Sequence, residues 1–410
     1  MIQSLLQRSA QLIQHKRFRD AEQQLLQVLS SEPNHADALS LMAICKSEAG
    51  NKQEAINLIK QSISLQPDND HFLYLHALFL IGEGKLKESE SQINHAITYN
   101  PGNADYFGLK ASIKLQQKEW QVALDNANQG LACEADNLTC LNIRSTALLK
   151  LNKKEESYQT IKEALSQDPE NDYTHANMGW GYLEKGQHEK ALESFTQSLK
   201  LNPGNALAKS GLVEALKARY LFYRLFLKYV FWVSNLKAKG QWFFIIGLYL
   251  GVRVLDSLAD SNSDLAPFIK PIIYAYMVFA ISTWLIDPLS NLFLRLNVYG
   301  RHALTRDEVK ASNLVGMALL GGIVSGIFYL LLQHKVLLNL LMYFFFMMMP
   351  LGSMLKPTAP AKRNLLIGYT TVLAIVGLVS VFLSGGTTLW IVFLIGVVAY
   401  QWVVNAILIR

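Results

Sequence analysis

The sequence predicts an all-α protein in two parts: an N-terminal solenoid of six helix–turn–helix repeats and a transmembrane bundle of six helical spans. Three observations carry this prediction: a 34-residue period in the first half, long apolar runs in the second half, and opposite net charges on the two halves. A fixed period of this length is typical of stacked helix pairs rather than of one globular core. The boundaries that follow are residues 1–205 for the solenoid, 206–239 for a capping and juxtamembrane amphipathic helix, and 240–410 for the polytopic transmembrane domain.

Turn residues and small residues mark the period together. The turn position is occupied by Pro33, Pro67, Pro101, Ala135, Pro169 and Pro203. Twelve residues before each of these lies a small residue, in the order Ala21, Ala55, Ser89, Ala123, Ser157 and Ala191. A second small set lies twelve residues earlier again, at Ser9, Ala43, Ala77, Ala111, Ser145 and Gly179. Small side chains at both places let two antiparallel helices of one repeat approach closely, as stacked repeats require.

The sixth repeat resembles a known family. It has the apolar–glycine pair Met178-Gly179, followed in register by Tyr182, Ala191, Phe195 and Pro203. This pattern resembles the tetratricopeptide repeat, and the resemblance extends over residues 2–205. It implies a right-handed array of helix pairs that binds other proteins. It does not name a partner, because arrays of this family bind unrelated proteins.

The same resemblance implies where a partner binds. In the tetratricopeptide family, one face of each first helix lines a concave groove. In this register the groove is expected to include Ile44, His71, Tyr74, Leu78, Asn142, Tyr173, Asn177 and Trp180. Exposed apolar and aromatic groups indicate contact with a partner, and Tyr and Trp are favoured anchors. Since the groove is not strongly basic, we expect a mixed polar–apolar protein segment as ligand. The alternative is that the array's own superhelix or its terminal helix buries this face.

Net charge separates the two halves. Residues 1–210 carry a net charge of −4 and residues 211–410 a net charge of +10. Basic residues between apolar runs indicate membrane orientation, whereas a basic soluble domain would indicate nucleic acid. We therefore expect a lipid bilayer and no nucleic acid among the partners.

The apolar runs predict the spans and their orientation. Each is close to the length that crosses a bilayer, and they lie at about 241–259, 269–290, 312–332, 336–355, 364–383 and 387–409. The connection from Arg295 to Lys310 and that from Leu355 to Asn364 are rich in Lys and Arg, and the intervening connections are not. Cytoplasmic loops carry such an excess. We expect a multi-pass protein, in a bacterial inner membrane, with its repeats and C-terminus in the cytoplasm.

Two further features concern the entry into the membrane. The first ten residues lack the apolar core of a signal peptide, so the repeats are expected to stay on the side of synthesis. Residues 220–234 are rich in aromatic side chains but contain Arg224 and Lys228. This composition predicts a helix at the membrane surface. The alternative is a helix packed against the last repeat.

Charged residues within the predicted spans form a second candidate site, of intramembrane polar groups: Arg253, Asp256, Lys270 and Asp287. Ionisable groups are costly in lipid and usually face protein or a water-filled cavity. One interpretation is a polar path or substrate site. The other is an internal salt bridge, with the remaining charges reaching out to the aqueous ends of the spans.

Signatures of catalysis and of metal binding are not found in the sequence. No HExxH, GxxxxGK[ST] or GxSxG motif occurs, and the three cysteines form no CxxC pair. We therefore expect no enzyme, no cofactor and no metal site. The leading hypothesis is a membrane-anchored adaptor or scaffold, which recruits a protein partner on its cytoplasmic face and assembles with a membrane protein or with itself. The rival hypothesis is a transporter or channel subunit with the repeats as a regulatory or assembly domain.

Overall fold

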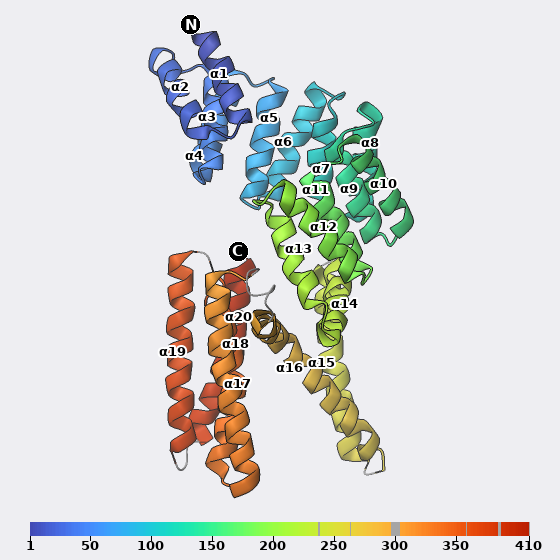
Figure 1. Cartoon of the computed structure of the whole chain (residues 1–410), viewed down its shortest axis with the longest axis vertical. Helices are drawn as coiled ribbons and strands as arrows, with labels where there is room; N and C mark the ends of the chain where they lie inside the picture. The colour runs from blue at the N-terminus through green and yellow to red at the C-terminus, as the bar shows by residue number, and fades with distance from the viewer. Residues whose placement is uncertain (237, 263, 297–303, 358, 384–386, 410) are drawn as a thin grey trace. The chain divides into compact units, whose positions relative to one another are not determined.

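Every regular element in the described part of the chain is an α-helix, as the sequence predicts (Figure 1). The computed structural model describes residues 1–410 except 237, 263, 297–303, 358, 384–386 and 410. The side chains of a few further helical residues are not described, those of residues 241, 242, 245 and 287 among them. By its contacts the chain divides into two compact units, Met1–Gly181 and Tyr182–Arg410.

The first unit consists of helix pairs joined by short turns. The helices are α1 (Ile2–Gln14), α2 (Phe18–Ser31), α3 (Ala36–Glu48), α4 (Lys52–Leu65), α5 (Asp70–Gly82), α6 (Leu86–Tyr99), α7 (Ala104–Gln116), α8 (Trp120–Cys133), α9 (Leu138–Lys150), α10 (Lys154–Gln167) and α11 (Asp172–Glu184), in which the boundary between the units falls. Each odd-numbered helix from α1 to α9 packs on the helix that follows it, and also on the next odd-numbered helix. This stacking confirms the predicted solenoid.

The two sets of small residues meet where the helices of one pair cross. The Ser89 hydroxyl on α6 donates to the backbone carbonyl oxygen of Ala77 on α5 at 2.7 Å. In the pair formed by α9 and α10, the hydroxyls of Ser145 and Ser157 lie 3.1 Å apart. All of these residues are buried. The spacing of twelve residues therefore marks the point of closest approach between two helices.

Asparagine caps explain why the period survives without proline at Ala135. Each first helix is preceded two residues earlier by the proline position and directly by a capping residue. Asn137 accepts a hydrogen bond from the backbone N–H of Cys140 at 3.0 Å, as Asn69 does from Phe72 at 3.2 Å. Such a cap satisfies one of the backbone donors that a helix start leaves open. Because Asn137 caps α9, the helix begins in register although Ala135 replaces the proline.

A left-handed residue ends the turn inside each repeat. These positions also recur every 34 residues: Lys16, Gly50, Gly84, Lys118, Asn152 and Gly186 all have positive φ. This conformation strains any residue with a Cβ by about 1–2 kcal/mol. Glycine is free of this strain, which accounts for its use at half of these positions.

Gly84→Ala is expected to lower the free energy of unfolding by about 1 kcal/mol, because Gly84 has a φ of +72°. An added Cβ would meet no atom within 4 Å, so the loss comes from the backbone alone. Gly82→Ala is the matched control: it is equally open but helical, and alanine favours a helix. Urea unfolding of the full chain in detergent, followed by circular dichroism, measures both. Equal effects of the two substitutions would contradict this explanation.

The second unit continues with the remaining helices. They are α12 (His188–Leu201), α13 (Ala206–Lys217), α14 (Leu221–Asn235), α15 (Ala238–Ser261), α16 (Ala266–Leu296), α17 (Arg306–Leu332), α18 (Lys335–Ser353), α19 (Pro360–Phe382) and α20 (Thr387–Ile409). The α14 helix contacts α16 through aromatic pairs, with the rings of Tyr229 and Phe279 5.1 Å apart and edge to face. Its opposite side leaves Phe222 and Trp232 exposed. The helix thus has one packed and one free aromatic face.

The prediction of six spans is corrected to four. Within the described residues, four helices are long and apolar enough to cross a membrane: Arg306–Leu332, Lys335–Ser353, Pro360–Phe382 and Thr388–Ile407. The predicted spans at 241–259 and 269–290 correspond to α15 and α16, which are not among them. Both helices carry charge within their length, at Arg253, Asp256 and Lys270 for example, and both contain side chains outside the described part. Their sequences are therefore less uniformly apolar than those of α17 to α20.

The four apolar helices form one bundle with its own core. In Figure 1, α17, α18 and α19 lie side by side, and α20 contacts both α18 and α19. Its buried centre combines aromatic residues and methionines, including Tyr343, Met347, Phe393 and Tyr400. Glycine lets the helices approach, since a Cβ at Gly321 would lie 2.7 Å from the Phe344 ring. Small residues of this kind are typical of membrane helix contacts.

Candidate functional site

An aromatic group on the first helices of two neighbouring repeats forms the centre of the expected groove. The rings of His71 and Tyr74 on α5 are stacked with centroids 6.1 Å apart, and the Tyr74 and Tyr106 rings are stacked at 5.3 Å. Tyr106 on α7 is buried, Tyr74 is half-buried and His71 is exposed. The stack therefore leads from the core of the solenoid out to its surface.

Asp70 fixes the inner end of this stack. Its Oδ2 accepts hydrogen bonds from the hydroxyl of Tyr106 and from the side-chain amide of Asn100, each at 2.9 Å. Burial raises the pKa of the Asp70 carboxyl, but these hydrogen bonds outweigh burial and the pKa is lowered. Burial and the hydrogen bond to Asp70 raise the pKa of the Tyr106 phenol. Tyr106 therefore stays neutral and donates, which holds its ring in place for Tyr74.

The exposed end of the stack is uncharged at neutral pH. Desolvation lowers the pKa of the His71 imidazole, although the carboxylates of Asp70 and Asp37 oppose the change. The pKa of the Tyr74 phenol is raised, again mainly by burial. Close by in sequence, Leu78 on the same helix is 41% exposed. The surface of α5 thus presents two rings and an aliphatic side chain without net charge.

Ile44 extends the apolar character of this surface to α3. It is partly buried and packs against the cluster that includes Ala43, Phe72 and Leu75. Since α3 and α5 are neighbours in the stack, Ile44 and the rings of α5 come from adjacent first helices. The residues predicted on α3 and α5 are therefore brought together.

A polar network joins the residues predicted on α9 and α11. The amide nitrogen of Asn142 donates to the hydroxyl of Thr174 at 2.9 Å, and its amide oxygen accepts from Asn177 at 3.0 Å. The Thr174 hydroxyl in turn donates to Asn171, which caps α11. Asn142 is only 3% exposed, so its amide links two repeats and presents little surface. Buried amides satisfied in this way hold neighbouring helices in a fixed register.

Two aromatic residues of α11 accompany this network. Tyr173 is 51% exposed, and Trp180 is half-buried. Burial of part of the ring raises the pKa of the Tyr173 phenol, and a hydrogen bond with Asn177 acts in the opposite direction. Tyr173 is therefore the exposed aromatic group at this end of the first unit.

Sequence reasoning did not identify Tyr106 and Asp70 as part of this site. Neither falls on the face that the repeat register assigns to the groove, and both act from beneath it. The available signal was Asp70 directly after the capping Asn69, at the start of an otherwise apolar helix. The assignment of the eight groove residues to a partner remains a prediction.

The intramembrane polar residues do not gather in the described part of the chain. Arg253 is exposed, donates to the hydroxyl of Tyr249 at 3.3 Å, and lies 5.8 Å from the centre of that ring on its own helix. Asp256 is half-buried and Lys270 is exposed. The side chain of Asp287 lies outside the described residues. Their joint role in a polar path remains untested.

The cysteines have environments that suppress reactivity. Cys45 and Cys140 are buried and Cys133 is exposed, all three as free thiols. Burial raises the pKa of the Cys45 thiol to about 11 and that of Cys140 to about 12. Since the thiolate is the reactive form, both buried thiols are inert at neutral pH. Among the described residues, no group of three His, Cys, Asp or Glu side chains could hold a metal ion.

Comparison with known proteins identifies the repeats. Models of the tetratricopeptide repeat match residues 12–78, 48–113 and 173–205. A search of curated protein sequences gave no match. The matched stretches fall within the helix pairs of the solenoid, and the membrane half is matched by none of these models.

Solved structures with similar repeats include three that cover about half of this chain. YrrB, described as a TPR protein with an unusual peptide-binding site, is 17% identical, with 45% of this chain and 95% of that one covered and a TM-score of 0.33. PilF of Pseudomonas aeruginosa is 16% identical, with 51% and 95% covered and a TM-score of 0.42. A tetratricopeptide repeat protein from Parabacteroides merdae is 14% identical, with 52% and 82% covered and a TM-score of 0.46.

Proposed function

We propose that this chain, whose N-terminal half carries tetratricopeptide repeats, is a membrane-anchored adaptor that recruits a protein segment to the bilayer. The repeats bind the segment through the groove, and the four apolar helices hold the chain in the membrane. Repeats of this family bind peptide or protein partners, which gives the general activity. The groove residues, the anchoring and the location are our own inference for this chain.

The observation that carries the proposal is the exposed aromatic and aliphatic surface of α5 and α11. Leu78 and Tyr173 are 41% and 51% exposed, on first helices that stack into one array. Aromatic rings that are held from below contribute large contact area with little loss of side-chain entropy. The uncharged rings, Leu78 and the nearby amide of Asn177 together suit a mixed polar–apolar segment.

Anchoring is supported by the length and composition of α17 to α20. The basic residues of this bundle gather at one end, where α17 begins at Arg306 and where Lys356, Lys362 and Arg363 connect α18 to α19. We assign this end to the cytoplasm by the positive-inside rule. We further propose a bacterial inner membrane as the location, and assembly with a membrane protein or a second copy. We do not extend the proposal to transport, because Arg253 bonds to Tyr249 on its own helix.

Removing the exposed groove side chains is expected to abolish partner capture. In cells, the full chain is cross-linked to its neighbours and the recovered proteins are quantified by mass spectrometry. With Leu78→Ser and Tyr173→Ser combined, we expect at least a ten-fold loss, on the order of the effect of one interface anchor. The loss follows from the removal of apolar contact area without change to the core.

The control carries the same substitutions on second helices. Leu65 on α4 is 41% exposed and Tyr99 on α6 is 54% exposed, so the combined Leu65→Ser and Tyr99→Ser variant loses a similar surface away from the groove. It is expected to capture the same proteins as the unaltered chain. If both double variants retain capture equally, the groove assignment is wrong.

A further inference from the structure

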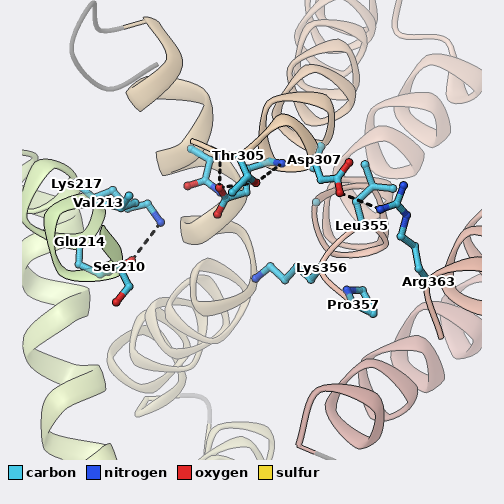
Figure 2. A pocket seen from close by; sticks show the side chains of 14 residues that line it. Ser210, Val213, Glu214, Lys217, Thr305, Asp307, Leu355, Lys356, Pro357 and Arg363 are labelled. Carbon is cyan, nitrogen blue, oxygen red and sulfur yellow. Dashed lines mark hydrogen bonds and ion pairs between the residues drawn. The ribbon is translucent and has the colours of Figure 1, made fainter. Parts of the chain in front are cut away.

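A cavity opens at the basic end of the membrane bundle, between α13, α16, α17, α18 and α19. It has a volume of about 710 Å³, which is ample for a small ligand. Figure 2 shows its lining, with Glu214 and Lys217 on one side, Thr305 and Asp307 on another, and Lys356 projecting between them. All of its walls belong to the second unit. The cavity takes no part in the groove of the repeats.

Both signs of charge line this cavity, and most of the charges are held in place. Arg363 forms an ion pair with Asp307 at 2.9 Å, which joins the start of α19 to the start of α17 (Figure 2). Lys217 pairs with Glu214 at 3.4 Å, and its side chain is 4% exposed. Buried charges that keep such partners form a fixed pattern of donors and acceptors. A ligand that enters meets cations and carboxylates in one site.

Two further bonds fix the carboxylates. Glu214 also accepts from the hydroxyl of Tyr223 at 2.5 Å. Glu308 accepts from the backbone N–H of Thr305 at 2.7 Å and from its hydroxyl at 2.9 Å, in a capping box at the start of α17. Lys356 lies at the exposed edge of the cavity, on the segment that follows α18. The cavity thus combines a firm inner wall with a basic side chain at its rim.

Asn291 supplies an acceptor that the protein does not use. It lines the cavity from α16, is 8% exposed, and its Oδ1 is buried without a hydrogen-bond partner among the residues that the structure describes. An unsatisfied buried acceptor of this kind costs about 1–3 kcal/mol. A ligand that donates a hydrogen bond to Oδ1 would recover this loss. The required group is an N–H or O–H donor.

A second cavity continues the first toward the bundle. Its volume is about 350 Å³, and it shares Glu214, Gly352 and Lys356 with the first cavity. Its remaining wall is mainly apolar and includes Phe226, Leu227, Val230, Met349 and Val404. A polar site with an adjoining apolar one, at the end of a membrane bundle, matches an amphiphile better than a fully polar molecule.

From these contacts we infer that the cavity binds the headgroup of a phospholipid that carries a primary amine and a phosphate diester, as in phosphatidylethanolamine. The ammonium donates to Asn291 Oδ1, the phosphate accepts from Lys356, and an acyl chain follows the apolar wall of the second cavity. The inference goes beyond partner recruitment, but it rests on the proposed membrane insertion. A soluble phosphate diester with the same amine would satisfy the polar contacts alone.

Lipid binding by the full chain in detergent tests this inference. Native mass spectrometry compares retention of phosphatidylethanolamine with that of phosphatidylcholine of the same chain length, whose trimethylated nitrogen donates no hydrogen bond. We expect at least ten-fold tighter retention of phosphatidylethanolamine. Glycerophosphoethanolamine, which lacks acyl chains, separates the two sources. Binding as tight as that of the lipid would overturn the lipid assignment.

Substitutions at Asn291 separate recognition from folding. Asn291→Leu removes the acceptor at similar volume and is expected to abolish the preference, whereas Asn291→Asp keeps an acceptor and is expected to retain it. Asn235 on α14 also has a buried Oδ1 without a partner in the described structure, but it lines neither cavity. Asn235→Leu is therefore the matched control and should bind as the unaltered chain does.

Two results would overturn the inference. One is equal retention of phosphatidylethanolamine and phosphatidylcholine by the unaltered chain, and the other is an unchanged preference in the Asn291→Leu variant. Loss of the preference in both Asn291→Leu and Asn235→Leu would assign it to general destabilisation and would also overturn the inference. Failure here leaves partner capture by the repeats intact, so the two proposals fail separately.

Discussion

Leu25→Ala is expected to open the first repeats, with a loss of about 2–5 kcal/mol in their local stability. Leu25 on α2 is fully buried and belongs to a cluster with Ala21, Val28, Met42 and Cys45, which spans α2 and α3. Removal of its side chain leaves a cavity between two repeats that their helices cannot close without leaving register. In a stacked array the loss falls mainly on the repeats in contact with the cavity.

Amide hydrogen exchange of the full chain in detergent measures this effect. Exchange in α1 to α3 is expected to accelerate at least ten-fold, since 1.4 kcal/mol corresponds to a factor of ten. Leu26 is the adjacent residue of the same type and is 54% exposed, so Leu26→Ala serves as the control. We expect little change from it. If the two variants exchanged alike, the assignment of Leu25 to the inter-helix core would be wrong.

The sequence was sufficient to predict the solenoid because its signals are local and repeated. Ala77 and Ser89 are twelve residues apart in the chain and in direct contact in the fold, so a period in the sequence maps onto one contact per repeat. The capping asparagines and the left-handed turn positions follow the same period. They were harder to recognise, because Lys118 and Asn152 occupy positions that glycine takes in other repeats.

The details of the groove depend on contacts that no periodicity reveals. The register places Asn142 on the groove face, but its amide is consumed by Thr174 and Asn177 of the next first helix. Tyr106 supports Tyr74 from a neighbouring repeat, which requires knowledge of how the repeats stack. Side-chain pairing between repeats is therefore what the sequence could not supply.

The membrane half was predicted from composition alone, and composition has no means of placing side chains. It identified α17 to α20, whose apolar runs are nearly uninterrupted, and it also counted α15 and α16 as spans, whose charges at Arg253 and Lys270 interrupt the run. The cavity with Asn291 was not foreseen. It joins α13 to helices about a hundred residues further along the chain, and only the folded bundle brings these elements together.

The largest effect expected of the whole account concerns membrane sidedness, because labelling from one side is all or none. Cys133 on α8 is exposed, and the other two cysteines are buried, so the chain carries a natural probe in its repeats. His334, at the turn between α17 and α18, is exposed at the end of the bundle opposite the basic connections. A cysteine introduced there reports on the other side of the bilayer.

Labelling of spheroplasts with a maleimide that does not cross membranes tests the central claim most directly. The account predicts that Cys133 reacts only after permeabilisation, whereas a Cys133→Ser, His334→Cys variant reacts from outside in intact spheroplasts. Reaction of Cys133 in intact spheroplasts, or protection of the thiol introduced at position 334, would contradict a cytoplasmic solenoid anchored by a membrane bundle.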